Sequence, residues 1–445
     1  MQRKWSSMTI VIAVITMLLL TACGGSPSTG PSTSGSGSAN PGVLDPNKKY
    51  TVNFWEVFGT GANKTVLESL TKTYMQAHPN VTVNLQAYDS YPTLKTKITA
   101  AIAAGKPPTI AQVYETWAHQ YQQSDAIAPL QPFISGKNGL SQSDLADFYP
   151  ALLKDGQIDG TQYMLPFNKS DEVLYYNMDA MQKAGITAPP TTLDELKTDL
   201  TKATTGSQWG LSLTPSVDEW ASFYKALGGG DFVSQDGKSA AFVSDTNKQY
   251  ATQAMDLLAP LVKSGAVHVT KAFAWQNDFI AGKAVFALST IASYPFLAKP
   301  IGTNFKFNEA PYPGGPAGQF TQLYGTNLSI FKGVDADSQS ASWDYMKFLT
   351  SSEANSTFVQ GTGYMPIRQS TFNSTALQSY YDKTPPRKVG PQQINNAIVP
   401  STFPAWDLCR DFVTTNYTAV LSGQAAADAG VTKAGQQCTS ALAQG

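Results

Sequence analysis

The segment from Tyr50 to Tyr114 switches repeatedly between strand-like and helix-like spacing of apolar residues, and this alternation constrains the fold more than any other feature of the sequence. The predicted elements are a strand over Tyr50–Phe58, a helix over Asn63–His78, a strand over Val81–Leu85, a helix over Leu94–Ala104 and a strand over Thr109–Tyr114. Only short links separate them. Strands that alternate with helices in this way favour a parallel sheet with helices packed on it.

Polar and aromatic residues follow these strands at the points where ligands are expected. In sheets of this kind, ligands bind in the loops beyond the carboxyl ends of the strands. Three loops therefore become candidates: the one after the first strand, the Tyr88–Tyr91 region, and Tyr114 with Glu115. The second and third offer phenols and carboxylates, which can hydrogen-bond a small polar ligand.

The rest of the chain has the same mixed character. Gly282–Ser289 reads as a strand after a helix, while Lys248–Leu261 and Asp335–Leu349 have the apolar spacing of amphipathic helices. Thr192, with Glu195 three residues later, predicts a capped helix start. No fixed-period repeat occurs, which argues against a solenoid, and 445 residues correspond to two or three domains.

The first 48 residues predict export rather than folding. Basic residues near the start precede an apolar run over Met8–Leu20, which is short for a membrane span and has the length of a signal-peptide core. The run ends in Leu-Thr-Ala-Cys-Gly and resembles a bacterial lipobox, which implies cleavage after residue 22 and lipid on Cys23. The alternative is an uncleaved anchor helix. Residues 23–48 are dominated by Gly, Ser, Thr and Pro and predict a flexible tether.

Composition excludes several classes of partner. The 31 Lys and Arg residues balance 32 Asp and Glu residues, so the chain has no general attraction for nucleic acid. The three His residues are scattered without metal-type spacing, and we expect neither a metal nor another cofactor. In an exported chain, Cys409 and Cys438 form a candidate disulfide. Two unpaired buried thiols are the alternative.

Several motifs together resemble the extracellular solute-binding proteins of carbohydrate-type ABC importers. They are FIAGKAVFAL at Phe279–Leu288 and YMKFLTSSEANSTFVQGTGYMPIRQS at Tyr345–Ser370. Within that family, AAIAAGKPPTIAQVYE at Ala100–Glu115 and PFNKSDEVLYYNMDAMQKAG at Pro166–Gly185 resemble the Ugp type, which binds glycerol 3-phosphate and glycerophosphodiesters. The resemblance runs from about Tyr50 to Gly423.

The resemblance implies an α/β fold of the type II periplasmic-binding-protein class, with two lobes, crossover hinges and a ligand cleft between the lobes. The boundaries expected from it are residues 49–155 with about 285–345 for lobe 1, and residues 156–284 with about 346–445 for lobe 2.

The same resemblance implies a set of ligand contacts. The matched positions are Tyr91, Glu115, Ser170, Thr290, Gly325, Tyr364 and Arg410. Glu115 is expected to accept from glycerol hydroxyls, Ser170 to donate to phosphate, and Gly325 to let its backbone approach the ligand closely. Spacing favours Thr290 over Ser289 for a further hydroxyl contact. Arg410 is expected to pair with phosphate, opposite Glu115; a salt bridge to Asp407 or Asp411 is the alternative.

One position departs from the family pattern. Leu193 stands where a Trp often follows Pro-Pro-x-Thr, and we expect a wider, more apolar site there that admits a diester head group such as choline. Trp55, Trp117, Trp220 and Trp275 are further aromatic candidates, although the core is the more frequent place for such residues. In the GTGYMPIRQS segment, Tyr364 is expected at the cleft and Arg368 at the surface.

The sequence therefore predicts a lipid-anchored binding protein on the extracellular or periplasmic side of the cell membrane. It is expected to act as a monomer and to deliver a glycerophosphodiester, such as glycerophosphocholine, or glycerol 3-phosphate to ABC permease subunits. An oligosaccharide-binding protein is the alternative. No nucleophile elbow, zinc-protease motif or plausible Ser/His/Asp set occurs, so no enzyme is expected.

Overall fold

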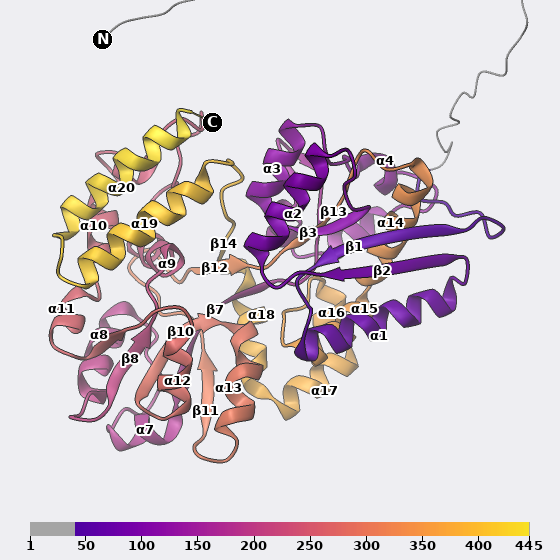
Figure 1. The fold of residues 1–445 in the computed structure, drawn as a ribbon. Coiled ribbons are helices and arrows are strands. Elements are labelled where there is room, and N and C mark those ends of the chain that lie inside the picture. Colours follow the sequence, from indigo (N-terminus) through magenta and orange to yellow (C-terminus); the bar gives the residue numbers. More distant parts are fainter. Residues whose placement is uncertain (1–40, 445) are drawn as a thin grey trace, which may run out of the picture. The chain divides into compact units, whose positions relative to one another are not determined.

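Two β-sheets organise the protein, and a computed structural model describes it over residues 41–444. The signal-peptide, Cys23 and most of the tether predictions lie outside this range. The first sheet has the strand order β2-β1-β3-β13-β6 and appears on the right of Figure 1. Its strands are β1 (Tyr50–Glu56), β2 (Val81–Ala87), β3 (Ile110–Val113), β6 (Leu165–Pro166) and β13 (Asn327–Ile330).

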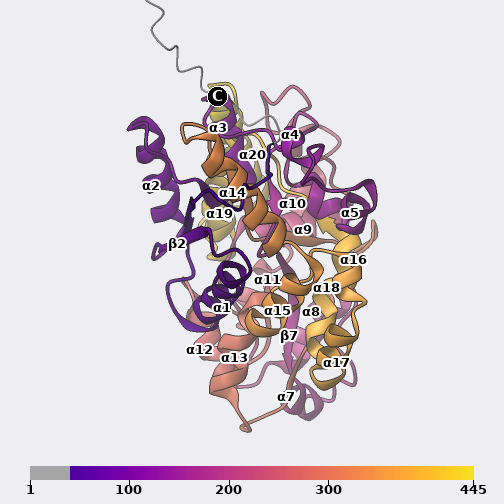
Figure 2. The same cartoon turned by 90° about the vertical axis from the view of Figure 1, so that its right-hand side faces the viewer.

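The predicted parallel alternation is confirmed in this first sheet. Strand β1 pairs in parallel with both β2 and β3, whereas β13 joins β3 antiparallel from a distant part of the chain. Burial alternates along β1, with Val52 and Phe54 fully buried in the core. The helices that accompany this sheet are α1 (Gly61–Ala77), α2 (Tyr91–Ala103), α3 (Glu115–Gln123), α14 (Ala336–Leu349) and α15 (Ser352–Thr362). Figure 2 shows α1 and α15 side by side, and they are in contact.

The second sheet is mixed and is built around the long strand β7 (Ser170–Asn177), which is buried along its whole length. Its strand order is β14-β12-β7-β10-β8-β9, and β11 also pairs with β7. The other strands are β8 (Trp209–Leu213), β9 (Val267–Val269), β10 (Ala284–Thr290), β11 (Phe307–Ala310), β12 (Thr321–Tyr324) and β14 (Ala397–Ile398). The helices of this half include α7 (Met178–Lys183), α8 (Leu193–Ala203), α9 (Val217–Leu227), α10 (Lys248–Asp256), α11 (Ala259–Lys263), α12 (Ala274–Ile280), α13 (Tyr294–Ile301), α19 (Trp406–Leu421) and α20 (Ala427–Leu442).

Shorter elements complete the chain. They are α4 (Gln131–Ile134), α5 (Gln142–Asp147), α6 (Pro150–Lys154), the hairpin of β4 (Gln157–Ile158) with β5 (Thr161–Gln162), α16 (Gln369–Phe372), α17 (Thr375–Lys383) and α18 (Val389–Gln393), with 3₁₀ turns at Ala241–Val243, Ile291–Ser293, Pro385–Lys388 and Ile394–Asn396. No helix within residues 41–444 is both long and apolar enough to cross a membrane.

The chain crosses between the sheets at three places. Residues 167–169 lead from β6 to β7, residues 325–326 lead from β12 back to β13, and a third connection runs from α15 to β14. The α/β, two-lobe architecture predicted from the sequence is therefore confirmed.

The boundaries expected for the lobes differ from the observed strand pairing. Residues 285–324 were expected in lobe 1, but β10, β11 and β12 all pair with β7 of the second sheet. The return to the first sheet begins at β13 and extends through α15, beyond the expected end at residue 345. Strand pairing at this distance along the chain leaves no trace in local periodicity, so the sequence could not assign these strands to a sheet.

Sequence signals that act within a few residues predicted helix boundaries more accurately than lobe boundaries. Thr192 and Glu195 form a capping box at the start of α8, as predicted. The helix predicted over Lys248–Leu261 is instead two helices, α10 and α11, because Pro260 stands in the first turn of α11 and cannot continue the helix before it.

Two expectations about the surface are wrong. The end of the predicted flexible tether is docked, since Gly42 donates its N–H to Ser340 and accepts from the Asn138 amide at 2.7 Å. Arg368 is 5% exposed rather than at the surface. Its guanidinium lies 3.8 Å from the ring centre of Phe148 and also contacts Asp147.

The predicted cysteine pair lies in contact across α19 and α20. Cys409 and Cys438 are free, buried thiols in this structure, so the predicted disulfide is not formed in it. The hydrogen bond with Cys409, together with burial, raises the pKa of the Cys438 thiol. Contact between the two thiols leaves the disulfide as a prediction for the exported protein.

We expect that thiol alkylation of the purified protein, denatured without reductant, labels neither cysteine. The double variant Cys409→Ser/Cys438→Ser should then lose about 3 kcal/mol in the free energy of unfolding, because a loop of this size loses its cross-link. Wild-type protein kept in reductant is the control. Full labelling of oxidised wild-type protein would show that the thiols stay unpaired.

Candidate functional site

Two neighbouring cavities lie where the chain crosses between the sheets. The first has a volume of about 490 Å³ and the second about 500 Å³. They share four lining residues, which are Tyr91, Tyr114, Tyr324 and Gly325. We call them the carboxylate cavity and the hydroxyl cavity, because Glu115 and Asp155 line the first, while Ser170 and Thr290 line the second.

Seven of the eight predicted ligand-contact residues line these two cavities. Glu115 and Arg410 line the carboxylate cavity; Ser170, Thr290 and Tyr364 line the hydroxyl cavity; and Tyr91 and Gly325 line both. They come from the ends of strands, from helices and from a crossover, and Tyr91 and Arg410 are 319 residues apart along the chain.

Leu193 is the exception. It begins α8, is 4% exposed and packs in the hydrophobic core of the second lobe, and it lines neither cavity. The expectation that this leucine widens the site is therefore wrong. Leu193 faces the core because the apolar side of an amphipathic helix packs against the protein interior.

Two of the three loops predicted at strand ends border the cavities. Tyr91 begins α2 directly after β2, and Tyr114 with Glu115 begins α3 directly after β3; both positions reach the cavities. The loop after β1 instead borders a separate cavity of about 150 Å³ that contains Phe58 and Gly59. Tyr88 also turns away and packs on Trp55, with ring centres 5.2 Å apart.

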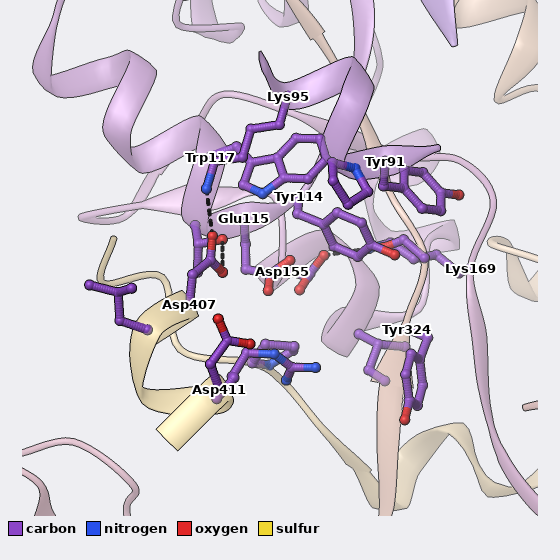
Figure 3. A pocket seen from close by; sticks show the side chains of 17 residues that line it. Tyr91, Lys95, Tyr114, Glu115, Trp117, Asp155, Lys169, Tyr324, Asp407 and Asp411 are labelled. Atoms are coloured by element: carbon purple, nitrogen blue, oxygen red, sulfur yellow. Dashed lines mark hydrogen bonds and ion pairs between the residues drawn. The ribbon is translucent and has the colours of Figure 1, made fainter. Parts of the chain in front are cut away.

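Aromatic rings form one wall of the carboxylate cavity, as Figure 3 shows. Tyr114 packs edge-on against both Tyr91 and Trp117, with ring centres 5.1 and 5.2 Å apart. Of the four tryptophans considered from the sequence, Trp117 lines a cavity, whereas Trp220 and Trp275 are buried in cores. Such a wall offers flat faces for a small polar ligand.

A buried amide holds the phenol groups in place. Asn168, which is fully buried on the first crossover, donates to the Tyr91 hydroxyl at 3.0 Å and accepts from Thr326 at 2.5 Å. Burial raises the pKa of the Tyr364 hydroxyl, and the neighbouring Asn168 and Tyr91 side chains act in the opposite direction. Gly363, in a left-handed conformation at the end of α15, turns the chain so that Tyr364 reaches this point.

Every cation that lines the two cavities is paired with a carboxylate. Lys95 contacts Asp407 at 2.7 Å, and Lys169 contacts Asp155 with both side chains 1% exposed. Arg410 pairs with Asp218 rather than with Asp407 or Asp411, through two N–O contacts of 2.7 Å. The cavities thus present no uncompensated positive charge.

Burial also keeps one carboxyl of the site neutral. Glu115 is 6% exposed, and burial together with the nearby Asp155 carboxylate raises its pKa to about 8. Lys169 and Arg410 act in the opposite direction with smaller effects. At neutral pH, Glu115 can therefore donate as well as accept a hydrogen bond.

A second layer of buried groups supports Tyr324 from the second lobe. The Tyr324 hydroxyl donates to Glu172 at 3.1 Å, and Ser222 donates to the other oxygen of Glu172 at 3.1 Å. Burial is the main cause that raises the pKa of Glu172 to about 8. Glu172 thus acts on the cavities by positioning Tyr324.

Sequence reasoning missed several residues of the site. They are Asp155, Lys169, Asn168, Asp218, Tyr324, Phe273 and Phe296. Asn168 and Lys169 stand inside the PFNKSDEV motif, so the motif marked the place without the roles. Asp155 and Asp218 carried no local signal, because only folding brings them to Lys169 and Arg410. Within residues 41–444, no group of three or more His, Cys, Asp or Glu side chains is arranged to hold a metal ion.

Comparison with known proteins finds one family model that matches most of the chain. The family model described as "Bacterial extracellular solute-binding protein" matches residues 69–385. The sn-glycerol-3-phosphate-binding periplasmic protein UgpB of Rhizobium meliloti is 24% identical over 409 residues, covering 88% of this chain and 94% of that protein.

Solved structures share the fold. UgpB from Mycobacterium tuberculosis, in complex with glycerophosphocholine, superposes with a TM-score of 0.77 at 18% identity, covering 88% of this chain and 98% of that one. A cyclic alpha-maltosyl-1,6-maltose binding protein from Arthrobacter globiformis superposes with a TM-score of 0.77 at 22% identity, covering 89% and 100%. At these identities the likeness establishes the fold alone.

The crossover at Gly325 yields a test of the architecture. Its φ is +91°, and an added Cβ would lie 1.8 Å from the Asn168 carbonyl oxygen. We expect Gly325→Ala to lower the free energy of unfolding by more than about 3 kcal/mol in chemical denaturation, because both the backbone conformation and the space are lost. Gly333→Ala is the matched control, since Gly333 also has a positive φ but its Cβ would meet only Pro107 at 3.4 Å. Equal effects at the two positions would contradict the close crossing.

The buried carboxyls predict how stability depends on pH. Glu172 holds its proton to about pH 8 in the folded protein, whereas an unfolded chain releases it near the ordinary value of 4.5. The free energy of unfolding should therefore fall as pH rises from 5 to 8, by up to about 1.4 kcal/mol per pH unit for each such group. Glu172→Gln should reduce this slope, and exposed Glu68→Gln should not. An unchanged slope in Glu172→Gln would show that Glu172 is ionised throughout.

Proposed function

The chain belongs to the family of bacterial extracellular solute-binding proteins, and from this premise we propose that it captures a glycerophosphodiester, such as glycerophosphocholine, and delivers it to the permease of an ABC importer. Glycerol 3-phosphate is a second, weaker ligand in this proposal. The N-terminal motif supports a lipid anchor on Cys23 that holds the receptor at the outer face of the cell membrane. We propose a monomeric binding protein and not an enzyme.

The observation that carries the choice of ligand is the charge balance of the two cavities. A phosphomonoester carries a charge of about −1.5 to −2 at neutral pH and is bound best by unpaired cations. Here Lys95, Lys169 and Arg410 are each compensated by a carboxylate. A diester has a single negative charge, which lowers the demand for cations and favours it over the monoester.

Neutral donors can bind the single charge of a diester. The hydroxyl cavity contains the hydroxyls of Ser170, Thr290 and Tyr364 and no charged side chain. Arg410 uses a two-pronged contact with Asp218, which leaves other guanidinium N–H groups for a ligand. The carboxylate cavity then suits glycerol hydroxyls, which can donate to Asp155 and exchange hydrogen bonds with a protonated Glu115.

An oligosaccharide is the alternative ligand, and the aromatic wall favours it. Tyr91, Tyr114 and Trp117 provide ring faces of the kind on which sugars stack. The two ligand classes differ in whether a negative charge is required for binding.

Calorimetric titration with glycerophosphocholine, glycerol 3-phosphate and maltotriose tests the proposal. We expect glycerophosphocholine to bind at least tenfold more tightly than glycerol 3-phosphate, with a Kd that changes less than about threefold between low and high salt because the site carries no net positive field. Asp218→Asn should leave the Arg410 charge unpaired and so reduce the difference in affinity between glycerophosphocholine and glycerol 3-phosphate.

Two measurements keep this test interpretable. Circular dichroism and thermal unfolding of Asp218→Asn check that the variant folds, since breaking a buried pair destabilises proteins by about 3–5 kcal/mol. Product analysis after prolonged incubation should find every compound intact. Tight binding of maltotriose with no binding of either phosphate would overturn the proposal in favour of the oligosaccharide.

A further inference from the structure

Exposed aromatic residues gather at one of the two cavities. Within residues 41–444, four large apolar side chains are exposed: Met178 at 37%, Phe273 at 72%, Phe296 at 63% and Leu408 at 52%. Both phenylalanines line the hydroxyl cavity, and Leu408 lines the carboxylate cavity. Exposed phenylalanine costs free energy in water, and apolar surface gathered at a cavity marks a place where something binds.

Phe273 is held in its exposed position by the backbone before it. Ala272 has a φ of +49°, a left-handed conformation that is unfavourable for alanine. The Thr214 hydroxyl donates to the Ala272 carbonyl at 2.7 Å, and Thr214 also bonds to Thr270. This fixes the turn, so Phe273 stands at the start of α12 with its ring in the open rather than in the core.

Phe296 is presented by a rigid helix start. Pro295 lies in the first turn of α13, Tyr294 packs on Phe307 with ring centres 5.3 Å apart, and Leu297 is fully buried. With its neighbours anchored on the inner face, Phe296 is left on the side of α13 that faces the cavity. The backbone at both phenylalanines is therefore held in place before any ligand arrives, which lowers the entropic cost of binding.

The hydroxyl cavity combines these two rings with neutral hydrogen-bond donors. A ligand complementary to this cavity has a polar group that can hydrogen-bond to Ser170 and Thr290. Next to this group it has a part that contacts the rings and needs no hydrogen bonds. We propose that Phe273 and Phe296 determine specificity by binding a quaternary ammonium substituent on the far side of the phosphodiester; this rests on the function proposed above.

Chemistry favours a quaternary ammonium over the other substituents that a diester can carry. The two phenylalanine rings have no hydrogen-bonding atom, so a primary ammonium or a second glycerol placed on their faces would lose water contacts without replacement by the rings. Gln276 and Ser293 are further polar residues that line this cavity. A trimethylammonium group has no N–H to satisfy, is weakly hydrated, and is attracted by the negative faces of aromatic rings. In the neighbouring cavity each of the three cations is paired with a carboxylate, so that cavity adds no net repulsion to a cationic ligand group.

The test compares diesters that differ only in this substituent. Wild-type protein, Phe273→Ala, Phe296→Ala and the double variant are titrated calorimetrically with glycerophosphocholine, glycerophosphoethanolamine and glycerophosphoglycerol. We expect the double variant to lose about tenfold in affinity for glycerophosphocholine and less than twofold for the other two diesters. Phe273→Trp should retain or raise the affinity for the choline diester.

Met178→Ala is the matched control, since it also removes an exposed apolar side chain but lies outside both cavities. Because both phenylalanines are more than half exposed, their removal should leave the thermal unfolding temperature unchanged.

Three outcomes would overturn the inference. If the double variant lost equal affinity for all three diesters, the rings would act in closure of the lobes and not in specificity. If it lost no affinity for glycerophosphocholine, the rings would have no role in binding. Wild-type protein that binds none of the diesters would overturn the proposed function and this inference with it, whereas normal wild-type binding with unchanged variants would overturn this inference alone.

Discussion

The buried ion pair between Lys169 and Asp155 joins the segments on which the whole site depends. Lys169 stands on the first crossover and also donates to the carbonyl of Gly325, on the second crossover, at 3.0 Å. Asp155 accepts in addition from Asn327 at 2.7 Å. Two crossovers that are more than 150 residues apart are thereby held together by one network. Loss of either partner of such a buried ion pair strongly destabilises a folded protein.

This network sets the geometry of both cavities. Gly325 approaches the Asn168 carbonyl so closely that no side chain fits, and Asn168 in turn positions the hydroxyl of Tyr91. The same pairing removes the positive charge of Lys169 from the ligand site. Charge compensation recurs at Lys95 and Arg410, so the cavities present hydroxyls, amides and rings rather than a cationic field.

Much of this could be read from the sequence, and the failures have a common cause. The strand and helix alternation, the capping box at Thr192 and the strand-end positions of Tyr91 and Glu115 all depend on neighbours within a few residues. The expectation that Leu193 contacts the ligand was wrong because a family position does not say which way a side chain faces once the helix packs. The carboxylate that pairs with Arg410 could not be predicted, because Asp218 lies 192 residues away in the chain. The nearby Asp407 was an equally reasonable choice from the sequence.

By itself, the sequence determined which segments become strands and helices, and it predicted seven of the residues that line the two cavities. These properties follow from local periodicity, from turn and cap residues, and from motifs, all of which act over short stretches of chain. The tertiary structure alone decided which sheet β10, β11 and β12 join, which carboxylate compensates each cation, and that Phe273 and Phe296 stand at a cavity. Such pairings depend on packing between residues far apart in the chain, where burial and space, rather than sequence spacing, select the partner.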